Sequence, residues 1–275
     1  VAEYLASHVC QSALEGLNSC VMAYGQTGAG KTFSLHGDRE MHGALPVLLE
    51  MLDGVAERTS LRMSVLDVYN EVLSDLLVDT PSRRMLRATE EGEVYVEGLA
   101  KLDVADSEAA LMVLESAWNR RCFRATTMGE LSSRSTSVVI LETTIRDGTE
   151  EFPSRHFIVD LGGSERPRIT VSADTGEVKR ILFPMTALHN VLASRADARP
   201  HIPYRDSKIT RLLQSALGDD MDRTLLLGCL SPADSNESRS TLRCVDRFHN
   251  IPCKTRPPRR SAEEFVLRLG GAMVK

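Results

Sequence analysis

The sequence predicts an α/β fold in which a central, mostly parallel or mixed sheet carries helices on both faces. Along the 275 residues, short apolar runs alternate with segments whose apolar residues recur every three or four positions, the pattern of strands alternating with helices. Some runs, such as 225–227, are apolar throughout, which is typical of a strand covered on both sides. A hydrophobic content of 42% is enough for a substantial core.

The first elements follow from periodicity. Residues 1–17 are predicted to form a helix because apolar side chains recur at every fourth position, and residues 19–24 are predicted to form a buried strand. A second helix is expected to begin near Pro46, since proline suits the first turn of a helix. Residues 61–70 alternate and are rich in β-branched side chains, which predicts a strand, and residues 71–77 are predicted to be helical.

The middle of the chain is predicted to be less regular. Residues 80–93 are polar and predict a loop, which leads into a short strand at 94–96. Asp106, together with the serine after it, is expected to cap a helix that runs to about Arg120.

The remaining elements return to strands and helices. Residues 137–145 are a predicted strand, and the Asp147-Gly148 pair after it is a hairpin-turn signal. Residues 157–159 and 223–230 are predicted to be buried strands, and a capped helix is expected over 206–218.

Composition excludes several classes of protein. No apolar run is long enough to span a membrane, and a net charge of −5 does not predict a nucleic-acid partner. The six cysteines form no C-x-x-C pair, so neither zinc nor a disulfide framework is indicated. Basic residues gather in 195–275, with 15 Lys+Arg against 10 Asp+Glu. An acidic partner could dock there, although an ordinary solvated surface is the simpler explanation.

The loop after the strand at 19–24 has the most specific chemistry. It fits the pattern G-x-x-x-x-G-K-[ST] at every fixed position. Glycines let backbone N–H groups surround an anion, the lysine brings a positive charge to the outer phosphates, and the threonine hydroxyl can ligate Mg²⁺. The strand before the loop favours nucleotide binding over a chance Gly-rich turn. The predicted nucleotide-binding residues are Gly25, Gln26, Thr27, Gly28, Ala29, Gly30, Lys31 and Thr32.

A second loop, at 160–165, follows a buried strand. Asp160 stands at the carboxyl end of that strand, where an aspartate can hold the shell of a Mg²⁺ ion. Gly163 can offer its N–H to a γ-phosphate. Read alone the Asp-x-x-Gly pattern is weak, but beside a phosphate loop it predicts a γ-phosphate sensor.

A third loop contains Ser132 and Ser133, whose hydroxyls could reach Mg²⁺ or orient an attacking water. Arg134 could pair with Glu165 and close the site when both loops move inward. A serine-rich surface loop is the alternative.

The segment 201–214 enters the predicted helix over 206–218. Lys208 and Arg211 are three residues apart and share a face of that helix, and Arg205 precedes them. Such a basic row suits an acidic partner surface, although a solvated helix face would have the same composition.

Taken in order, these motifs resemble the kinesin motor domain over roughly residues 1–250. They are the phosphate loop, Ser-Ser-Arg-Ser at 132–135, Asp-Leu-x-Gly-Ser-Glu at 160–165 and the run that starts His-Ile-Pro-Tyr-Arg at 201. The resemblance implies a P-loop NTPase that hydrolyses ATP with Mg²⁺ and binds microtubules (tubulin), in the cytoplasm on the microtubule cytoskeleton.

The resemblance also implies a role for each motif residue. Lys31 would hold the β- and γ-phosphates, Thr32 and Ser133 would ligate Mg²⁺, Asp160 would hold the outer shell of that ion, and Gly163 would sense the γ-phosphate.

The other implied roles belong to the moving loops and to the track. Ser132 would help to place the lytic water, and Arg134 and Glu165 would form a salt bridge between the two loops. The residues that would contact microtubules are His201, Arg205, Lys208 and Arg211.

The sequence also departs from the family. Gly129 and Thr136 stand where kinesins usually carry Asn and His. Pro184 interrupts the helix after the 160–165 loop, so this helix is expected to begin near Pro184 and to be short. The first strand of kinesins, which ends in Arg-x-Arg-Pro, precedes Val1. We expect a motor domain over 1–250 that lacks its first strands, with a gap beside the phosphate-loop strand, and a basic neck-linker-like segment with a short helix over 251–275.

Two other functions stay open. A pseudo-motor would bind microtubules or another partner with weak or absent turnover of ATP, and the altered helix at Pro184 is compatible with it. A P-loop NTPase without a cytoskeletal partner is disfavoured by the motifs at 160–165 and 201–214. The sequence does not fix an oligomeric state.

Overall fold

The computed structural model describes residues 1–38, 40–55, 58–79, 83–127, 132–165, 175–218, 222–252 and 257–259. At 123–127, 132 and 175–182 the description covers the backbone only. The predicted basic linker and short helix beyond residue 252 lie almost entirely outside these ranges. Within them, Arg259 donates its backbone N–H to the carbonyl of Glu15 (3.1 Å), which places residues 257–259 beside the end of the first helix.

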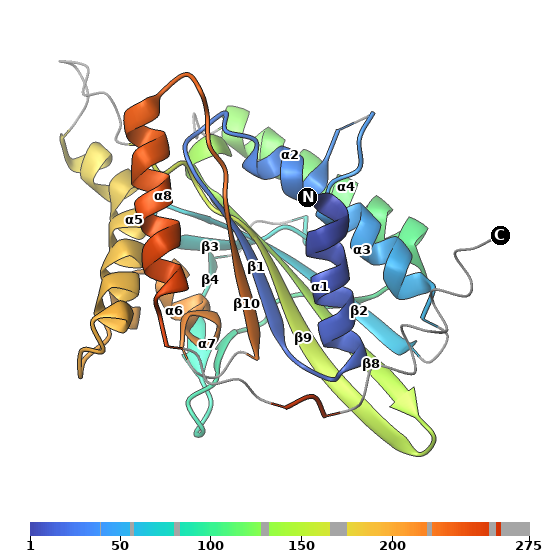
Figure 1. Cartoon of the computed structure of the whole chain (residues 1–275). Helices are drawn as coiled ribbons and strands as arrows, with labels where there is room; N and C mark the ends of the chain where they lie inside the picture. The colour runs from blue at the N-terminus through green and yellow to red at the C-terminus, as the bar shows by residue number, and fades with distance from the viewer. Residues whose placement is uncertain are drawn as a thin grey trace.

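A mixed sheet of eight strands forms the centre of the molecule (Figure 1), in the order β10-β1-β9-β8-β2-β3-β4, with β7 also paired to β2. The pairs of β1 with β9 and β10 are parallel, and the other pairs are antiparallel. A small second sheet pairs β5 with β6. The strands are β1 (Ser19–Tyr24), β2 (Arg58–Tyr69), β3 (Val72–Asp75), β4 (Arg83–Arg84), β5 (Leu86–Ala88), β6 (Val94–Val96), β7 (Leu102–Asp103), β8 (Thr136–Asp147), β9 (Glu150–Asp160) and β10 (Arg223–Gly228).

Helices cover both faces of the sheet, as predicted (Figure 1). One face carries α1 (Ala2–Leu14), α2 (Lys31–His36), α3 (Ala44–Asp53) and α4 (Ser107–Thr127). The other face carries α5 (Thr175–Ala196), α6 (Lys208–Leu212), α7 (Gln214–Leu217) and α8 (Ser235–His249). In the described part of the chain, no helix is both long enough and apolar enough to cross a membrane.

The core is divided by the sheet into two layers, and β1 contributes to both. Its side chains alternate because successive residues of a strand point to opposite faces. Val21 and Ala23 pack under α1 and α3, whereas Cys20, Met22 and Tyr24 pack under α5 and α8. All six residues of β1 are buried, so the strand that leads into the phosphate loop lies inside the molecule.

The prediction of a helix at 71–77 is wrong. The segment forms β3, which pairs antiparallel with β2 from Tyr69 opposite Val72 onward. The tight turn between the two strands places Asn70 and Glu71 at positive φ, 48° and 59°. Without a glycine in the turn, the sequence carries no hairpin signal, since residues other than glycine rarely adopt this conformation. The loop predicted at 80–93 also contains short strands, β4 and β5.

The prediction that a short helix begins near Pro184 is also wrong. The helix α5 starts at Thr175, and Pro184 lies inside it. Proline removes one backbone hydrogen bond, but a helix that packs one face against a core can continue past it. The predicted helix over 206–218 is divided at Leu213 into α6 and α7, and Ser207 is its capping residue.

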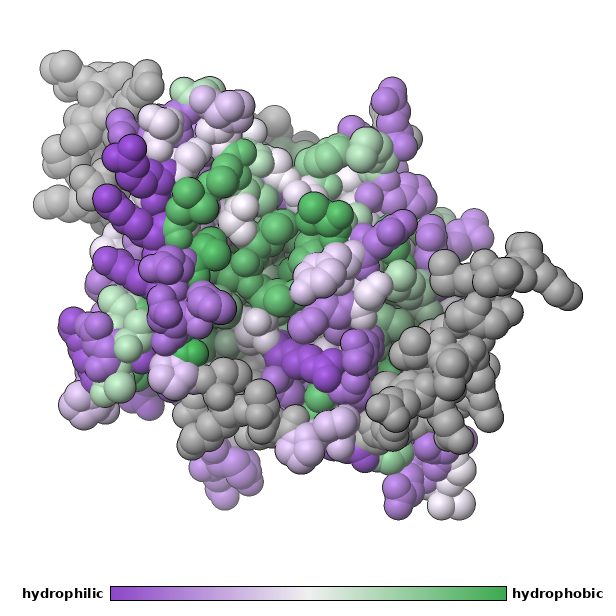
Figure 2. Space-filling model, viewed as in Figure 1, coloured by the Kyte–Doolittle hydropathy of each residue, from purple (hydrophilic) through white to green (hydrophobic). Residues whose placement is uncertain are grey.

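The expected gap beside the phosphate-loop strand does not exist. Both edges of β1 are paired, one with β9 and the other with β10. The described strand that lacks a second neighbour on this side is β10, at the end of the sheet. Its six residues are half-buried, and Figure 2 shows an apolar area in the middle of this face of the molecule.

Candidate functional site

The predicted phosphate loop joins the carboxyl end of β1 to α2. Gly28 and Gly30 have φ of 78° and 92°, and a Cβ on either would meet no atom within 4 Å. Their backbone conformation, rather than crowding, therefore favours glycine. Gly25 is required for a different reason, because a Cβ there would lie 2.2 Å from the carbonyl oxygen of Cys229.

Lys31 and Thr32 begin α2 and point back to the loop and to β9. The Lys31 ammonium group donates hydrogen bonds to the carbonyls of Gly25 (2.8 Å) and Gln26 (2.9 Å). Burial lowers the pKa of Lys31, although nearby Asp160 opposes the shift. The Thr32 hydroxyl donates to Oδ2 of Asp160 at 2.6 Å, so two motifs 128 residues apart meet at one point.

Asp160 is the buried acid of the site, with 3% of its surface exposed. Burial raises its pKa, and the hydrogen bond from Thr32 and the charges of Arg121 and Lys31 act in the opposite direction. The Oδ1 atom is buried without a hydrogen-bond partner. A carboxylate oxygen in this state lacks the partner that buried polar atoms normally have, and a Mg²⁺ shell would provide one.

A cavity of about 250 Å³ lies against these groups. The phosphate loop, Thr32, Ser133 and Asp160 line it, together with three residues of α4 that the sequence analysis missed: Trp118, Arg121 and Cys122. Arg121 lies 4.9 Å from the centre of the Trp118 ring and contacts Asp67 and Ser135. No local motif marks these residues. One signal was available: Arg121 follows the single tryptophan of the chain by three positions, so the two share a helix face and could have been predicted to contact one another.

The loops at 132–135 and 160–165 are in contact. Gly163 donates its N–H to the carbonyl of Ser133 at 2.7 Å, and Ser164 donates its N–H to the carbonyl of Gly25 at 3.1 Å. The side chain of Ser132 is outside the described residues. These contacts bring the predicted γ-phosphate sensor to the phosphate loop.

The expected pair of Arg134 with Glu165 is not formed between these described side chains. Glu165 instead accepts hydrogen bonds from the backbone N–H (2.8 Å) and the hydroxyl (2.5 Å) of Thr27. Arg134 lines a small crevice beside Gly162 and Pro184. The carboxylate of Glu165 therefore occupies donors of the phosphate loop.

The basic segment lies at the start of α6. Ser207 caps this helix in a capping box with Thr210, and Glu71 accepts hydrogen bonds from the Ser207 hydroxyl (2.7 Å) and the Lys208 N–H (2.6 Å). Glu71 lies in the turn between β2 and β3, which was not predicted from the sequence, and its carboxylate holds the start of α6 in place. Of the four predicted microtubule-contact residues, His201 and Arg205 are exposed, and Lys208 and Arg211 are half-buried.

Comparison with known proteins matches this arrangement to one family. The sequence model described as "Kinesin motor domain" matches residues 1–251. This chain belongs to the kinesin motor domain family. The kinesin-like protein Klp68D of Drosophila melanogaster is 36% identical over 90% of the chain and 33% of its own length. Kinesin-related protein 7 of Dictyostelium discoideum is 33% identical over 86% of the chain and 20% of its own length.

The fold of the kinesin motor domain is also found by structural comparison. A solved structure titled "Structure of a fast kinesin: Implications for ATPase mechanism and interactions with microtubules" superposes with a TM-score of 0.84 and 31% identity. The match covers 92% of this chain and 76% of that one. The chain spans between a fifth and a third of the length of these curated kinesin relatives.

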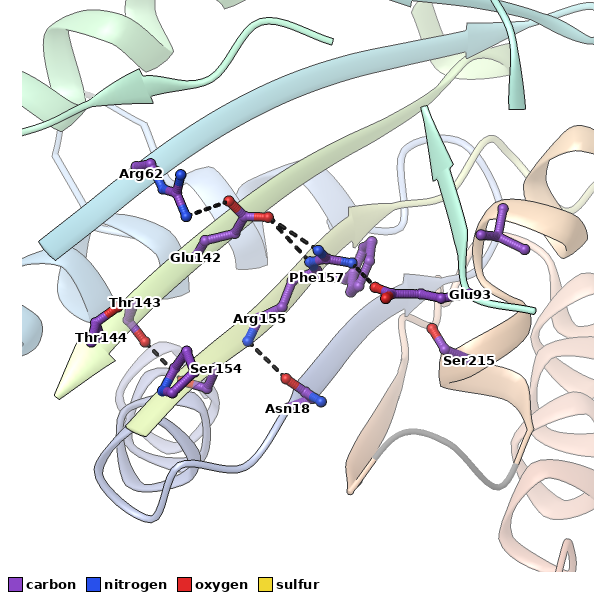
Figure 3. A pocket seen from close by; sticks show the side chains of 12 residues that line it. Asn18, Arg62, Glu93, Glu142, Thr143, Thr144, Ser154, Arg155, Phe157 and Ser215 are labelled. Atoms are coloured by element: carbon purple, nitrogen blue, oxygen red, sulfur yellow. Dashed lines mark hydrogen bonds and ion pairs between the residues drawn. The ribbon is translucent and has the colours of Figure 1, made fainter. Parts of the chain in front are cut away.

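A larger cavity, of about 370 Å³, lies at the opposite end of the strands (Figure 3). Its charged side chains neutralise one another: Glu142 contacts Arg62 (3.4 Å) and Arg155 (3.2 Å), and Arg155 also contacts Glu93. Lys101 adds a further bond to Glu142 at 2.8 Å. A site whose cations are already paired offers little to a phosphate, so this cavity does not compete with the phosphate loop.

Proposed function

We propose that this kinesin-family chain is an ATP-binding and ATP-hydrolysing microtubule motor domain. In this proposal residues 1–250 form the motor domain, 251–275 form a neck-linker-like segment, and the protein acts on cytoplasmic microtubules. The observation that carries the proposal is the meeting of the Thr32 hydroxyl with Asp160, whose second oxygen is buried and unpaired beside a cavity. This donor set fits Mg²⁺ bound to a nucleotide.

The proposed roles follow from position. Lys31 exchanges its bonds to the loop carbonyls for the outer phosphates of ATP, and Thr32, Ser133 and Asp160 hold Mg²⁺ directly or through water. When bound, Mg²⁺ neutralises charge that develops on the transferred phosphoryl group. Gly163 turns its N–H from the carbonyl of Ser133 to the γ-phosphate.

The moving loops complete the proposed site. Ser132 helps to place the attacking water. Glu165 leaves Thr27 and pairs with Arg134, and this exchange closes the two loops over ATP.

Steady-state ATPase of the full chain across a microtubule titration tests the proposal. We expect turnover that microtubules stimulate, and its loss in Lys31→Ala, because the charge on the outer phosphates is then missing. Arg83→Ala is a matched control, since it removes an exposed cation from β4, at the end of the sheet, rather than from the phosphate loop. Equal turnover in Lys31→Ala would refute the assignment of this site.

A pseudo-motor is the second candidate, and Pro184 inside α5 favours it. If α5 couples the loops to the track, as the resemblance to kinesins implies, the backbone hydrogen bond lost at Pro184 weakens the element that carries the coupling. Bound nucleotide without turnover at any microtubule concentration would establish the pseudo-motor.

The microtubule partner is tested separately. Arg205, Lys208 and Arg211 are expected to supply affinity that falls with salt, because exposed charge pairs weaken as the Debye length shortens. Co-sedimentation with microtubules at low and high salt measures it. If the triple alanine variant sediments as well as wild type, the basic row is only a solvated surface.

A further inference from the structure

The cysteines in the described part of the chain differ in their exposure. Cys10, Cys20, Cys229 and Cys244 are buried, and burial raises the pKa of each of these four thiols. Cys122, on α4, is exposed. Disulfide exchange needs a thiolate that a reagent can reach, so burial protects the four thiols in the core. Among the described cysteines, Cys122 is therefore the one open to a reagent from solution.

Cys122 lies on the wall of the cavity beside the phosphate loop. The thiol lines this cavity together with Thr27, Gly28 and Lys31 of the loop. Trp118, one helical turn earlier on α4, lines the cavity as well. The helix thus presents a reachable thiol to the same space that the phosphate loop encloses.

A second and independent feature shows that this cavity receives a ligand. Asp160, on the cavity wall, is 3% exposed, and its Oδ1 atom is buried without a hydrogen-bond partner. Buried polar atoms are normally hydrogen bonded, so this oxygen indicates a ligand or ion that enters the cavity. The buried ammonium group of Lys31 brings a positive charge to the same space. The ligand that these groups favour is anionic.

The size of the cavity makes Cys122 a sensitive position. Its volume is about 250 Å³. Ligand pockets typically measure roughly 300–1,000 Å³, so there is little room to spare. A tripeptide attached to Cys122 and the phosphates of a nucleotide would occupy the same space, so that either one excludes the other.

We propose that Cys122 is a modification site at which glutathione disulfide closes the nucleotide cavity. Glutathione is an anionic tripeptide, and its charge suits a cavity whose loop receives anions. The inference rests on the proposed function, because that proposal assigns the cavity to Mg·nucleotide. It adds a form of regulation to this site: nucleotide protects the thiol, and the modified thiol excludes nucleotide.

The chemical step is a thiol–disulfide exchange. The Cys122 thiolate attacks one sulfur of glutathione disulfide, and a new S–S bond joins Cys122 to one glutathione. The original S–S bond breaks, and the second glutathione leaves as a thiolate that takes up a proton. The Cys122 sulfur is oxidised and the released sulfur is reduced. An excess of a reducing thiol reverses the exchange and opens the cavity again.

The test follows modification and binding in the full chain. Wild type is treated with glutathione disulfide, with and without Mg·ADP, and peptide mass spectrometry locates the added group over time. Isothermal titration calorimetry measures Mg·ADP affinity before treatment, after treatment and after reduction with dithiothreitol. Two variants serve as controls. Cys122→Ser removes the thiol, and Cys122→Ser combined with Thr149→Cys moves it to the exposed turn between β8 and β9.

We expect modification of Cys122 to weaken Mg·ADP binding by more than about tenfold, and dithiothreitol to restore it. Mg·ADP at about 100 times its Kd is expected to slow the modification by about a hundredfold, because only the unliganded fraction reacts. In the double variant, residue 149 is expected to react at a rate that Mg·ADP does not change. In both variants, treatment is expected to leave Mg·ADP affinity at its value before treatment.

Three results overturn the inference and leave the proposed function intact. The first is modification of Cys122 without any loss of Mg·ADP affinity. The second is an equal loss of affinity in treated Cys122→Ser, which would place the effect at another thiol. The third is a Cys122 that does not react while residue 149 of the double variant does. If untreated wild type fails to bind Mg·ADP, the proposed function itself fails, and the inference fails with it.

Discussion

The carboxylate of Glu165 holds both the N–H and the hydroxyl of Thr27, so an internal anion sits on the phosphate loop. Lys31 is satisfied in the same way by the carbonyls of Gly25 and Gln26. In the proposed function, nucleotide would have to displace these hydrogen bonds, and its affinity would include the free energy needed to break them.

This arrangement predicts that Glu165→Ala binds Mg·ADP more tightly than wild type. Hydrogen bonds to charged groups contribute about 1.5–3 kcal/mol each when well shielded and less when half-exposed, so we expect a gain of about three- to tenfold. Fluorescence of Trp118 during a Mg·ADP titration measures it. Glu150→Ala, an equal change of charge at the exposed start of β9, is expected to have no effect. Unchanged or weaker binding in Glu165→Ala would show that the carboxylate does not compete with nucleotide.

At the scale of elements, α5 contains Pro184, a residue that disfavours a helix interior, and packing must compensate for it. The helix continues through the proline because Met185, Leu188 and Val191 are buried on its inner face. Helices in proteins are stabilised mainly by such packing rather than by intrinsic propensity.

We predict that Pro184→Ala raises the free energy of unfolding by about 1–3 kcal/mol, because a proline within a helix costs about 3 kcal/mol and part of this is already relieved by local adjustment. Urea denaturation provides the measurement. Asn190→Ala, at an exposed position of the same helix, is expected to gain only about 0.5 kcal/mol. A loss of stability in Pro184→Ala would mean that the contacts of the proline in its crevice outweigh the missing hydrogen bond.

Prediction from sequence succeeded where residue types are dictated locally. The phosphate loop needs glycines at positive φ and a lysine, so its pattern is readable without any knowledge of the fold. The hairpin at Asn70 and Glu71 was missed because its turn uses residues that seldom adopt that conformation. The order of the strands in the sheet was not predictable either, since nothing in the sequences of β1 and β10 indicates that they pair with each other.

The candidate site was predictable in its motifs but not in its contacts. The motifs predict that Thr32 and Asp160 serve one ion, and in the structure the Thr32 hydroxyl lies 2.6 Å from Oδ2 of Asp160. Arg121 and Trp118 were not predicted, because the sequence of α4 does not show which part of the molecule the helix packs against. The partner of Glu165 was predicted as Arg134, whereas the structure shows Thr27, because sequence cannot say which of two loop states is adopted.

Across the whole molecule, buried histidines make stability depend on pH. His156 is fully buried in β9 and is bonded to Ser19 (2.8 Å), Ser154 (3.0 Å) and Thr143 (3.2 Å). Burial lowers its pKa to about 3. Since this value lies below that of the unfolded chain, the neutral histidine contributes stability in full above pH 6.5, and the contribution is lost as pH falls from 6.5 towards 3.

The free energy of unfolding is expected to fall between pH 7 and pH 5, with His156 contributing up to about 1.4 kcal/mol per pH unit below 6.5. Urea denaturation at several pH values measures the slope. His156→Asn is expected to show a shallower slope whatever its stability at pH 7, because no proton is then taken up on unfolding at this position. Equal slopes would contradict the assignment of a buried neutral histidine.

The pairing of β1 on both edges has a mechanical consequence. Its six residues are in register with β10, and five of them also with β9. A strand held by two ladders cannot bend or slide without breaking both, so the phosphate loop stands on a stiff support. Any movement of the phosphate loop must then be taken up by the helices and loops that adjoin it, because the sheet resists the movement. The amide protons of Val21, Met22 and Ala23 are accordingly expected to be among the slowest in the chain to exchange with deuterium.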